Sequence, residues 1–167
     1  LGHNHVIAVN ELAGSVQLHD ELARTRFDLQ FPVASMTVDP PALRAAAGSD
    51  FSSVVGDAAR TGTRNNMLGP KLLDAVGFAR ITLRSERIST APNGLLATTR
   101  IRVRDHEALV DVPVSWQSDG NVLTVSGELK LRQTELDLTP YSVMLGAMRV
   151  ADQMTVRFNI VARRVAL

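Results

Sequence analysis

The sequence predicts an all-β fold in which about eight antiparallel strands form a barrel with a short helical cap. Three observations lead to this prediction: long segments alternate apolar and polar residues, glycine-containing turns separate them, and one helical segment interrupts the strands. Alternation with a period of two is typical of a strand with one buried face. Closing such strands into a barrel would remove the exposed edges of the sheet.

Length and composition limit the function classes. The chain has 167 residues, which predicts a single domain over residues 1–167. Its 18 basic and 17 acidic residues nearly cancel, and no run of Lys or Arg suggests a nucleic-acid partner. The absence of Cys excludes disulfides and thiolate chemistry. No segment approaches the roughly 18 apolar residues that cross a bilayer, and the start inside an expected strand suggests a removed leader or a missing strand.

The first part of the chain predicts short strands and one short helix. Residues 3–11 and 14–19 are expected to pair, and residues 25–31 alternate strictly, with Phe27 and Leu29 on the apolar face. Pro32 favours an edge or a bend before a further strand at 35–39. Asp39 is expected to cap a helix over residues 42–48, because two prolines follow it.

Residues 61–85 are expected to organise the chain, because a helical segment leads there directly into a strand. Met67, Leu68, Leu72 and Leu73 form its apolar stripe, which Gly69-Pro70 interrupts. Such a stripe is more often ordinary core, yet it would also suit a cap over a barrel opening. We therefore expect an element that closes the barrel.

Five long strands follow, at residues 80–88, 95–104, 108–117, 122–131 and 153–164. Their separating segments contain Asn93-Gly94, residues 105–107, Gly120-Asn121 and a long irregular stretch, and the Asn and Gly residues favour tight hairpins in a meander. Each strand has one apolar face. Ala97, Thr99 and Gly127 are small residues on these faces, so we expect a continuous apolar cavity inside the barrel.

Few residues suggest chemistry. His3 and His5 would share one face of a strand, so both could bind one metal ion if a third ligand such as His19 came close. The alternative is that they are polar residues at a strand end. The charged group at 102–107 is typical of a solvated hairpin tip. With no nucleophile elbow, phosphate loop or paired carboxylates, the sequence predicts no enzyme and no cofactor.

The order of these elements resembles the YceI-like family. The segments that carry the resemblance are TRNNMLGPKLLDAVGFARITLRSERI, LLATTRIRVRDHEALVDVPV, VSGELKLRQTELDLTP and DQMTVRFNIVA. The chain departs from the usual pattern at Ala79, Leu83 and residues 104–106, and its LGHNH start is similar to a divergent branch. The resemblance implies a lipocalin-like barrel, periplasmic or secreted, that holds a long-chain isoprenoid or similar amphiphile.

The predicted function is therefore a non-catalytic carrier for a long apolar molecule such as an isoprenoid, a quinone or a fatty amphiphile, with a homodimer left open. The expected ligand-lining residues are Phe27, Leu29, Met67, Leu68, Leu72, Leu73, Ile81, Leu83, Ile101, Val112, Val125, Leu129, Val156 and Phe158. Two alternatives stay open: a metal-dependent protein built on His3 and His5, and an interaction module whose barrel interior is packed.

Overall fold

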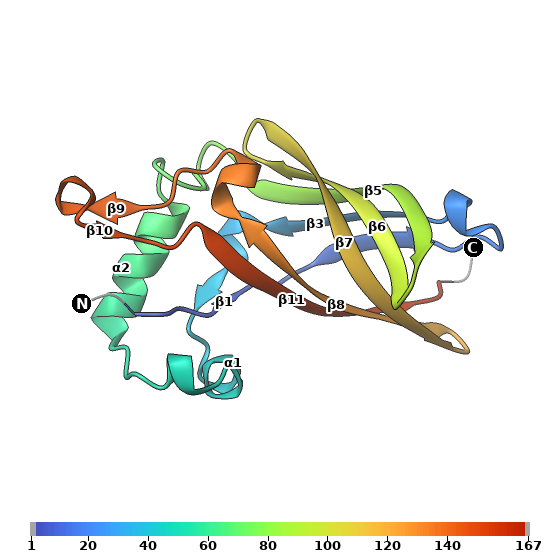
Figure 1. Ribbon diagram of the computed structural model, residues 1–167, viewed down its shortest axis with the longest axis horizontal. Helices are drawn as coiled ribbons and strands as arrows, with labels where there is room; N and C mark the ends of the chain where they lie inside the picture. The colour runs from blue at the N-terminus through green and yellow to red at the C-terminus, as the bar shows by residue number, and fades with distance from the viewer. Residues whose placement is uncertain (1–2, 166–167) are drawn as a thin grey trace.

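The computed structural model describes residues 3–165 and contains a seven-stranded antiparallel sheet that curls into a half-barrel (Figure 1). The strand order is β11-β8-β7-β6-β5-β3-β2. The strands are β2 (Ala13–Gln17), β3 (Arg26–Pro32), β5 (Arg80–Ala91), β6 (Gly94–Val103), β7 (His106–Asp119), β8 (Val122–Arg132) and β11 (Gln153–Arg163). The predicted lipocalin-type architecture is confirmed. Over the described residues the edge strands β2 and β11 do not pair, so the sheet stays open.

Shorter elements lie outside this sheet. Strand β1 (Ile7–Ala8) pairs with β4 (Thr37–Val38), and β9 (Ser142–Val143) pairs with β10 (Met148–Arg149). The α-helices are α1 (Pro41–Ala46) and α2 (Asp57–Leu68), and 3-10 helices cover Leu22–Arg24, Val33–Ser35, Ser49–Phe51, Gln133–Leu136 and Met144–Gly146. Leu1 and Gly2 of the LGHNH motif lie outside the described residues.

The long meander follows the sequence prediction closely, because its hairpin turns have a local cause. Gly94 and Gly120 adopt positive φ at two of the turns, as expected for the residues that favour them. The third turn differs, since it lies at Arg104 and Asp105 rather than at 105–107, and Arg104 takes the left-handed conformation with φ 57°. Two-residue turns therefore set the register between the consecutive strands from β5 to β8.

The predicted pairing of residues 3–11 with 14–19 is wrong. Strand β1 pairs with β4 instead, and β2 pairs with β3. The cause is Asp39, whose N–H donates to the Val6 carbonyl oxygen at 2.7 Å and whose carboxylate accepts from the Val6 N–H at 2.8 Å. These bonds hold the start of the chain beside β4.

Asp39 does not cap α1 either, because Pro40 occupies the N-cap position and the cap makes no side-chain hydrogen bond. Its buried carboxylate instead accepts from His5 Nδ1 at 2.7 Å and from Arg44 Nη1 at 2.8 Å, beside the Val6 bond. Arg44 also donates to the carbonyl oxygens of Asn4 and Ser53. The carboxylate thus joins the segment before β1 to α1, and Arg44 extends the connection to the loop before α2.

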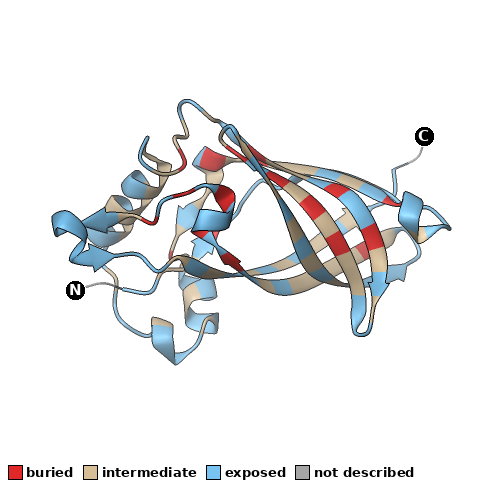
Figure 2. Ribbon diagram, turned by 45° about the horizontal axis from the view of Figure 1, so that its top comes forward, coloured by how far each residue is buried: buried red, intermediate tan, exposed pale blue. Residues whose placement is uncertain are grey.

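Helix α2 lies across one end of the half-barrel, on the left in Figure 1. It begins at Asp57, earlier than predicted, and ends before Gly69-Pro70 as expected. Where this cap meets the sheet, the largest group of buried side chains forms the core. Its members are Phe31, Val33, Leu73, Ile81, Ile101, Val103, Leu131, Leu136 and Leu138. Figure 2 shows the buried positions at this end and along β5 and β6.

Replacing Asp39 with Asn should lower the free energy of unfolding by about 3 kcal/mol, because it leaves the Arg44 guanidinium without its charged partner. Burial alone would raise the pKa of the Asp39 carboxyl, but hydrogen bonds from Val6, His5 and Arg44 hold it below the ordinary value. The stabilisation is therefore complete above about pH 4 and is lost as the pH falls through the lowered pKa.

Urea unfolding of wild type and Asp39→Asn at neutral and acidic pH measures both effects. The difference between the two proteins should shrink below about pH 4. Asp20→Asn, a change at an exposed carboxylate, is the matched control and should leave stability nearly unchanged. An Asp39→Asn protein as stable as wild type at neutral pH would contradict the assigned role.

Candidate functional site

The concave face of the sheet is one continuous apolar surface. Leu29, Leu83 and Ile101 are successive cross-strand partners on β3, β5 and β6. On the other side of the half-barrel, Leu129 of β8 pairs with Val156 of β11. Cross-strand partners point to the same face of a sheet, so these rows line the interior together.

The polar groups on this face are few and already satisfied. The Phe27 N–H donates to Ser85 Oγ at 2.9 Å, and the buried Thr99 Oγ1 donates to the Ala97 carbonyl oxygen at 3.1 Å. On the strands β3, β5, β6, β7, β8 and β11, the arginines, lysines and acidic residues fall on the other face. The interior therefore suits an apolar molecule and offers no charge to a polar one.

Packing of this face differs from one side to the other. Strands β5 and β6 carry buried residues along their length, whereas β7 and β11 carry none among the residues described. Half-buried apolar side chains on the less packed side are Val112, Val125, Leu129, Val156 and Phe158. Inward-facing apolar surface that stays accessible means that side chains do not fill the space beside it.

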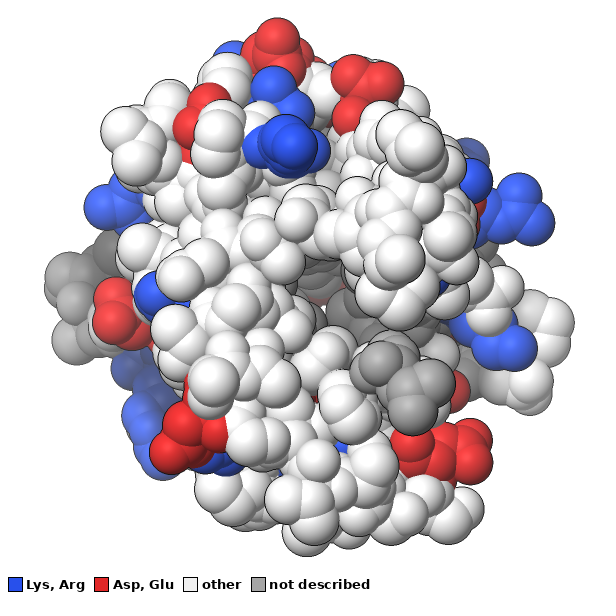
Figure 3. Space-filling model, turned by 90° about the vertical axis from the view of Figure 1, so that its left-hand side faces the viewer, with Lys and Arg blue, Asp and Glu red and all other residues white. Residues whose placement is uncertain are grey.

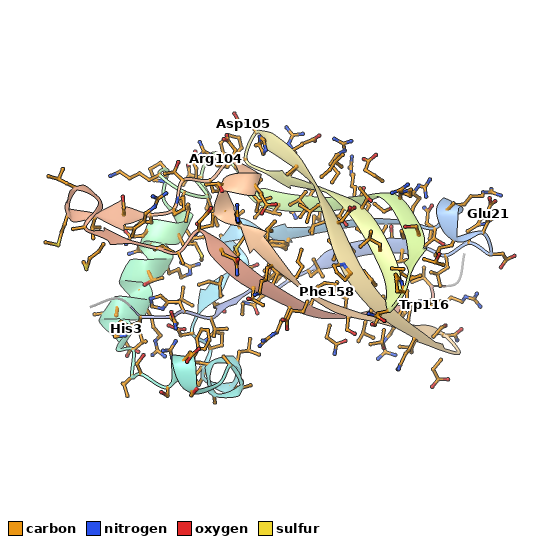
Figure 4. The ribbon with its side chains drawn as sticks, in the orientation of Figure 1. His3, Glu21, Arg104, Asp105, Trp116 and Phe158 are labelled. Atoms are coloured by element: carbon orange, nitrogen blue, oxygen red, sulfur yellow. The ribbon has the colours of Figure 1, made fainter. Side chains whose placement is uncertain are left out.

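A close approach at Gly127 shapes the same side. Gly127 pairs with Phe158, and an added Cβ at this glycine would overlap both the Phe158 ring and the Pro113 carbonyl oxygen. The small residue thus admits an aromatic ring, and does not simply leave a gap as the sequence suggested. Figure 4 shows Phe158 on β11 in the middle of the half-barrel.

The cap end of the molecule is hollowed. Figure 3 looks onto this end and shows a central depression whose rim is mostly uncharged. The β9–β10 hairpin extends from the same end in Figure 1, and its tip exposes Met144 and Leu145 at 72% and 109%. An apolar ligand entering here would first meet apolar surface.

Most predicted ligand residues reach the concave face or its cap, but their burial differs. Leu73, Ile81 and Ile101 are buried in the core. Met67, Leu68, Leu72, Leu83 and Val156 are partly buried against that core. The half-buried remainder outside it consists of Phe27, Leu29, Val112, Val125, Leu129 and Phe158. Contact with a ligand stays a prediction for all of them.

Arg64 of α2 holds the cap onto the sheet. Its Nε donates to the Met36 carbonyl oxygen at 3.2 Å, and Nη2 donates to the Ala34 carbonyl oxygen at 2.6 Å. These bonds engage the guanidinium with the backbone between β3 and β4. The arginine that begins the family-like segment therefore has a structural role here.

The predicted histidine pair lies at the cap end, where Figure 4 labels His3. The His3 and His5 rings are 6.3 Å apart, but His5 Nδ1 contacts Asp39 and Nε2 lies 3.3 Å from Thr63 Oγ1. His19 accepts from the N–H of Glu21, at the opposite end of the molecule. Over residues 3–165 no group of three or more His, Cys, Asp or Glu side chains could hold a metal ion.

Two polar features of the structure were not predicted from the sequence. One is the set of hydrogen bonds to the Asp39 carboxylate, because its donors come from two separate segments, residues 5–6 and α1. The other is a groove on the convex face lined by arginines of β5, β6 and the turn that follows. The sequence does contain a pattern that could have predicted this groove, since arginines recur on one face of two strands that form a predicted hairpin.

Comparison with known families matches the YceI-like domain model to residues 2–162, nearly the whole chain. The chain belongs to the YceI-like family. This family is known for polyisoprenoid-binding barrel proteins that are generally non-catalytic. No curated protein matches this YceI-like chain in sequence.

Solved structures show the same fold. BcnA of Burkholderia cenocepacia is 19% identical with a TM-score of 0.70, over 93% of this chain and 86% of BcnA. The YCEI protein of Campylobacter jejuni is 10% identical with a TM-score of 0.67, over 99% of this chain and 88% of that one. At such identities the likeness supports the fold alone. No helix among residues 3–165 is long and apolar enough to cross a membrane.

The two leucines after the cap helix should differ in their effect on stability. Leu73→Ala should cost about 2–5 kcal/mol, because Leu73 is a buried core residue. Leu72→Ala, the matched control at a partly buried neighbour, should cost clearly less. Chemical unfolding of both variants measures the difference. Equal losses would show that the whole segment, rather than Leu73 alone, belongs to the core.

The metal hypothesis for His3 and His5 is tested by calorimetry with zinc. If it holds, heat of binding should disappear in His3→Ala and weaken on acidification, because imidazole binds metal in its neutral form. His19→Ala is the control, since that residue lies at the other end. Absence of heat in wild type would leave both histidines as structural residues.

Proposed function

We propose that this YceI-like protein binds a long apolar molecule along the concave face of its half-barrel and carries or sequesters it without catalysis. The observation that carries the proposal is the uncharged concave face, which stays only half-buried along β7, β11 and the middle of β8. Covering apolar surface gains about 25 cal/mol per Å². A flexible hydrocarbon chain can supply this cover along the length of the strands.

Membership of the YceI-like family supports the same class of ligand. An isoprenoid, a quinone or a fatty amphiphile each has the required slender apolar chain, and the interior offers no charge that would select among their head groups. We infer a periplasmic or secreted protein from this membership. A second copy of the chain remains open as a partner.

The residues most suited to ligand contact are the half-buried ones, because the surface of the buried side chains is already covered by other protein atoms. Val112, Val125, Leu129, Val156 and Phe158 belong to this group. The cap would then close one end, with Met67, Leu68 and Leu72 facing the ligand at its rim. A packed interior without ligand is the alternative that the experiment below distinguishes.

Native mass spectrometry of freshly purified protein, with analysis of an organic extract, should reveal a co-purifying apolar molecule of constant mass. Protein stripped of that molecule should then bind a fluorescent polyene fatty acid with a single site. A stripped protein that binds no apolar probe would contradict the proposal and favour a packed interaction module.

A charge placed inside should abolish this binding. Val125→Arg puts a guanidinium on the concave face, where burying it without a partner costs several kcal/mol, so probe affinity should fall at least about tenfold. Leu109→Arg is the matched control, because Leu109 is 58% exposed on the convex face of β7. Equal affinities for the two variants would place the ligand elsewhere, provided that both keep the wild-type circular dichroism spectrum.

A further inference from the structure

The convex face of the sheet carries a groove of about 330 Å³ that the apolar interior does not explain. Five arginines line it, two from β5, two from β6 and Arg104 from the turn after β6, together with Phe78, Thr82 and Glu107. Figure 4 labels Arg104 and Asp105 at the β6–β7 turn, beside the segment that follows the cap helix.

Two of these arginines are neutralised within the protein. Arg84 Nε lies 2.9 Å from the Asp28 carboxylate, and Arg100 contacts Glu86 at 2.7 Å and Glu107 at 3.2 Å. The remaining three lie toward the cap end of the groove. Among residues 3–165, Arg80 and Arg104 form no salt bridge, and Arg102 reaches only Glu107, at 3.8 Å.

The three arginines converge because of strand register. Arg102 lies opposite Thr82, so Arg80 and Arg104 occupy the next positions along the two neighbouring strands. Alternate residues on a strand are about 7 Å apart, and neighbouring strands about 4.8 Å apart. Like charges held this closely repel one another unless an anion lies between them.

Arg104 is also fixed in position by the protein. Its guanidinium stacks over the Phe78 ring at 5.5 Å, and Nη1 lies 3.4 Å from the Leu72 carbonyl oxygen. Its Nε is the one buried side-chain nitrogen or oxygen without a hydrogen-bond partner in the described part of the chain. Buried donors are nearly always paired with an acceptor. Because the described part of the protein offers none to this N–H, an acceptor oxygen of a ligand would satisfy it.

We propose that this groove binds a phosphate group carried by a larger molecule, with Arg80, Arg102 and Arg104 as its ligands. A phosphate monoester presents three acceptor oxygens and close to two negative charges. Guanidinium groups match it with paired hydrogen bonds. The groove has room for more than the phosphate alone, so the rest of the molecule would extend over Thr82 and Phe78. This site is separate from the concave face and does not depend on the proposed function.

The phosphate could belong to a soluble compound or to a lipid head group, and two probes distinguish these sources. Pyrophosphate binding is measured by calorimetry at low salt, and lipid binding by flotation with phosphatidylcholine vesicles that contain phosphatidic acid, whose head group is a phosphate monoester. Arg80→Gln/Arg102→Gln removes two exposed ligands without touching the contacts of Arg104. Arg24→Gln/Arg163→Gln makes the same change in charge at exposed residues outside the groove.

Binding of either probe should weaken at least about tenfold in Arg80→Gln/Arg102→Gln and stay near wild type in the control, because the double variant loses two charge-assisted bonds to the phosphate. Binding of pyrophosphate identifies a soluble phosphate compound, and binding of vesicles alone identifies a lipid head group. Arg104→Gln should weaken the same probe. No binding of either probe, or equal loss in the control, would overturn the proposal.

Discussion

The apolar concave face of the curled sheet is the constraint on which the rest of this structure depends. A one-sided strand is stable only where something covers its inner face, because apolar surface left in water forgoes about 25 cal/mol per Å². At the cap end, α2 and residues 133–138 provide that cover, and Leu73, Ile81 and Ile101 are buried there. Along β7, β11 and the middle of β8, the described residues supply no equivalent cover, and this is the surface on which we propose that an apolar ligand binds.

The cover is held in place by polar contacts outside the sheet. Asp39 is a buried carboxylate, which is costly unless it is paired and hydrogen-bonded. Three donors satisfy it, and they come from the segment before β1 and from α1. Arg64 adds bonds from α2 to the backbone beside β4. These few contacts orient the helical part of the chain, whose own apolar stripe is short.

The two faces of β5 and β6 have opposite chemistry, because successive residues on a strand point to opposite sides. Ile81, Leu83 and Ile101 face the interior, while the arginines between them face solvent. Acidic neighbours neutralise the arginines far from the cap but not those near it. One hairpin therefore contributes to an apolar surface and to a cationic groove that lie back to back.

By itself the sequence determined the parts of the fold that have a local cause. Alternation from residue 80 to 131 and the turn residues predicted the strands of the long meander to within three residues at each end, since period and turn geometry act over a few positions. The Gly69-Pro70 break likewise ended α2 where expected. The segments that resemble the YceI-like family indicated a lipocalin-like barrel, of which the structure shows an open, seven-stranded half-barrel.

Only the tertiary structure decided what depends on contacts between distant segments. The partner of β1 and the engagement of both His5 nitrogens follow from contacts between residues more than thirty positions apart, as the bonds from His5 to Asp39 and Thr63 illustrate. The role of Asp39 combines such contacts with a local bond from Arg44. The open edge between β2 and β11 was also decided only by the tertiary structure. Alternation predicts which face of each strand is buried, but it predicts neither the number of strands nor whether the two edge strands pair. The arginine groove needed register, which places side chains of two strands side by side although the sequence separates them by about twenty residues.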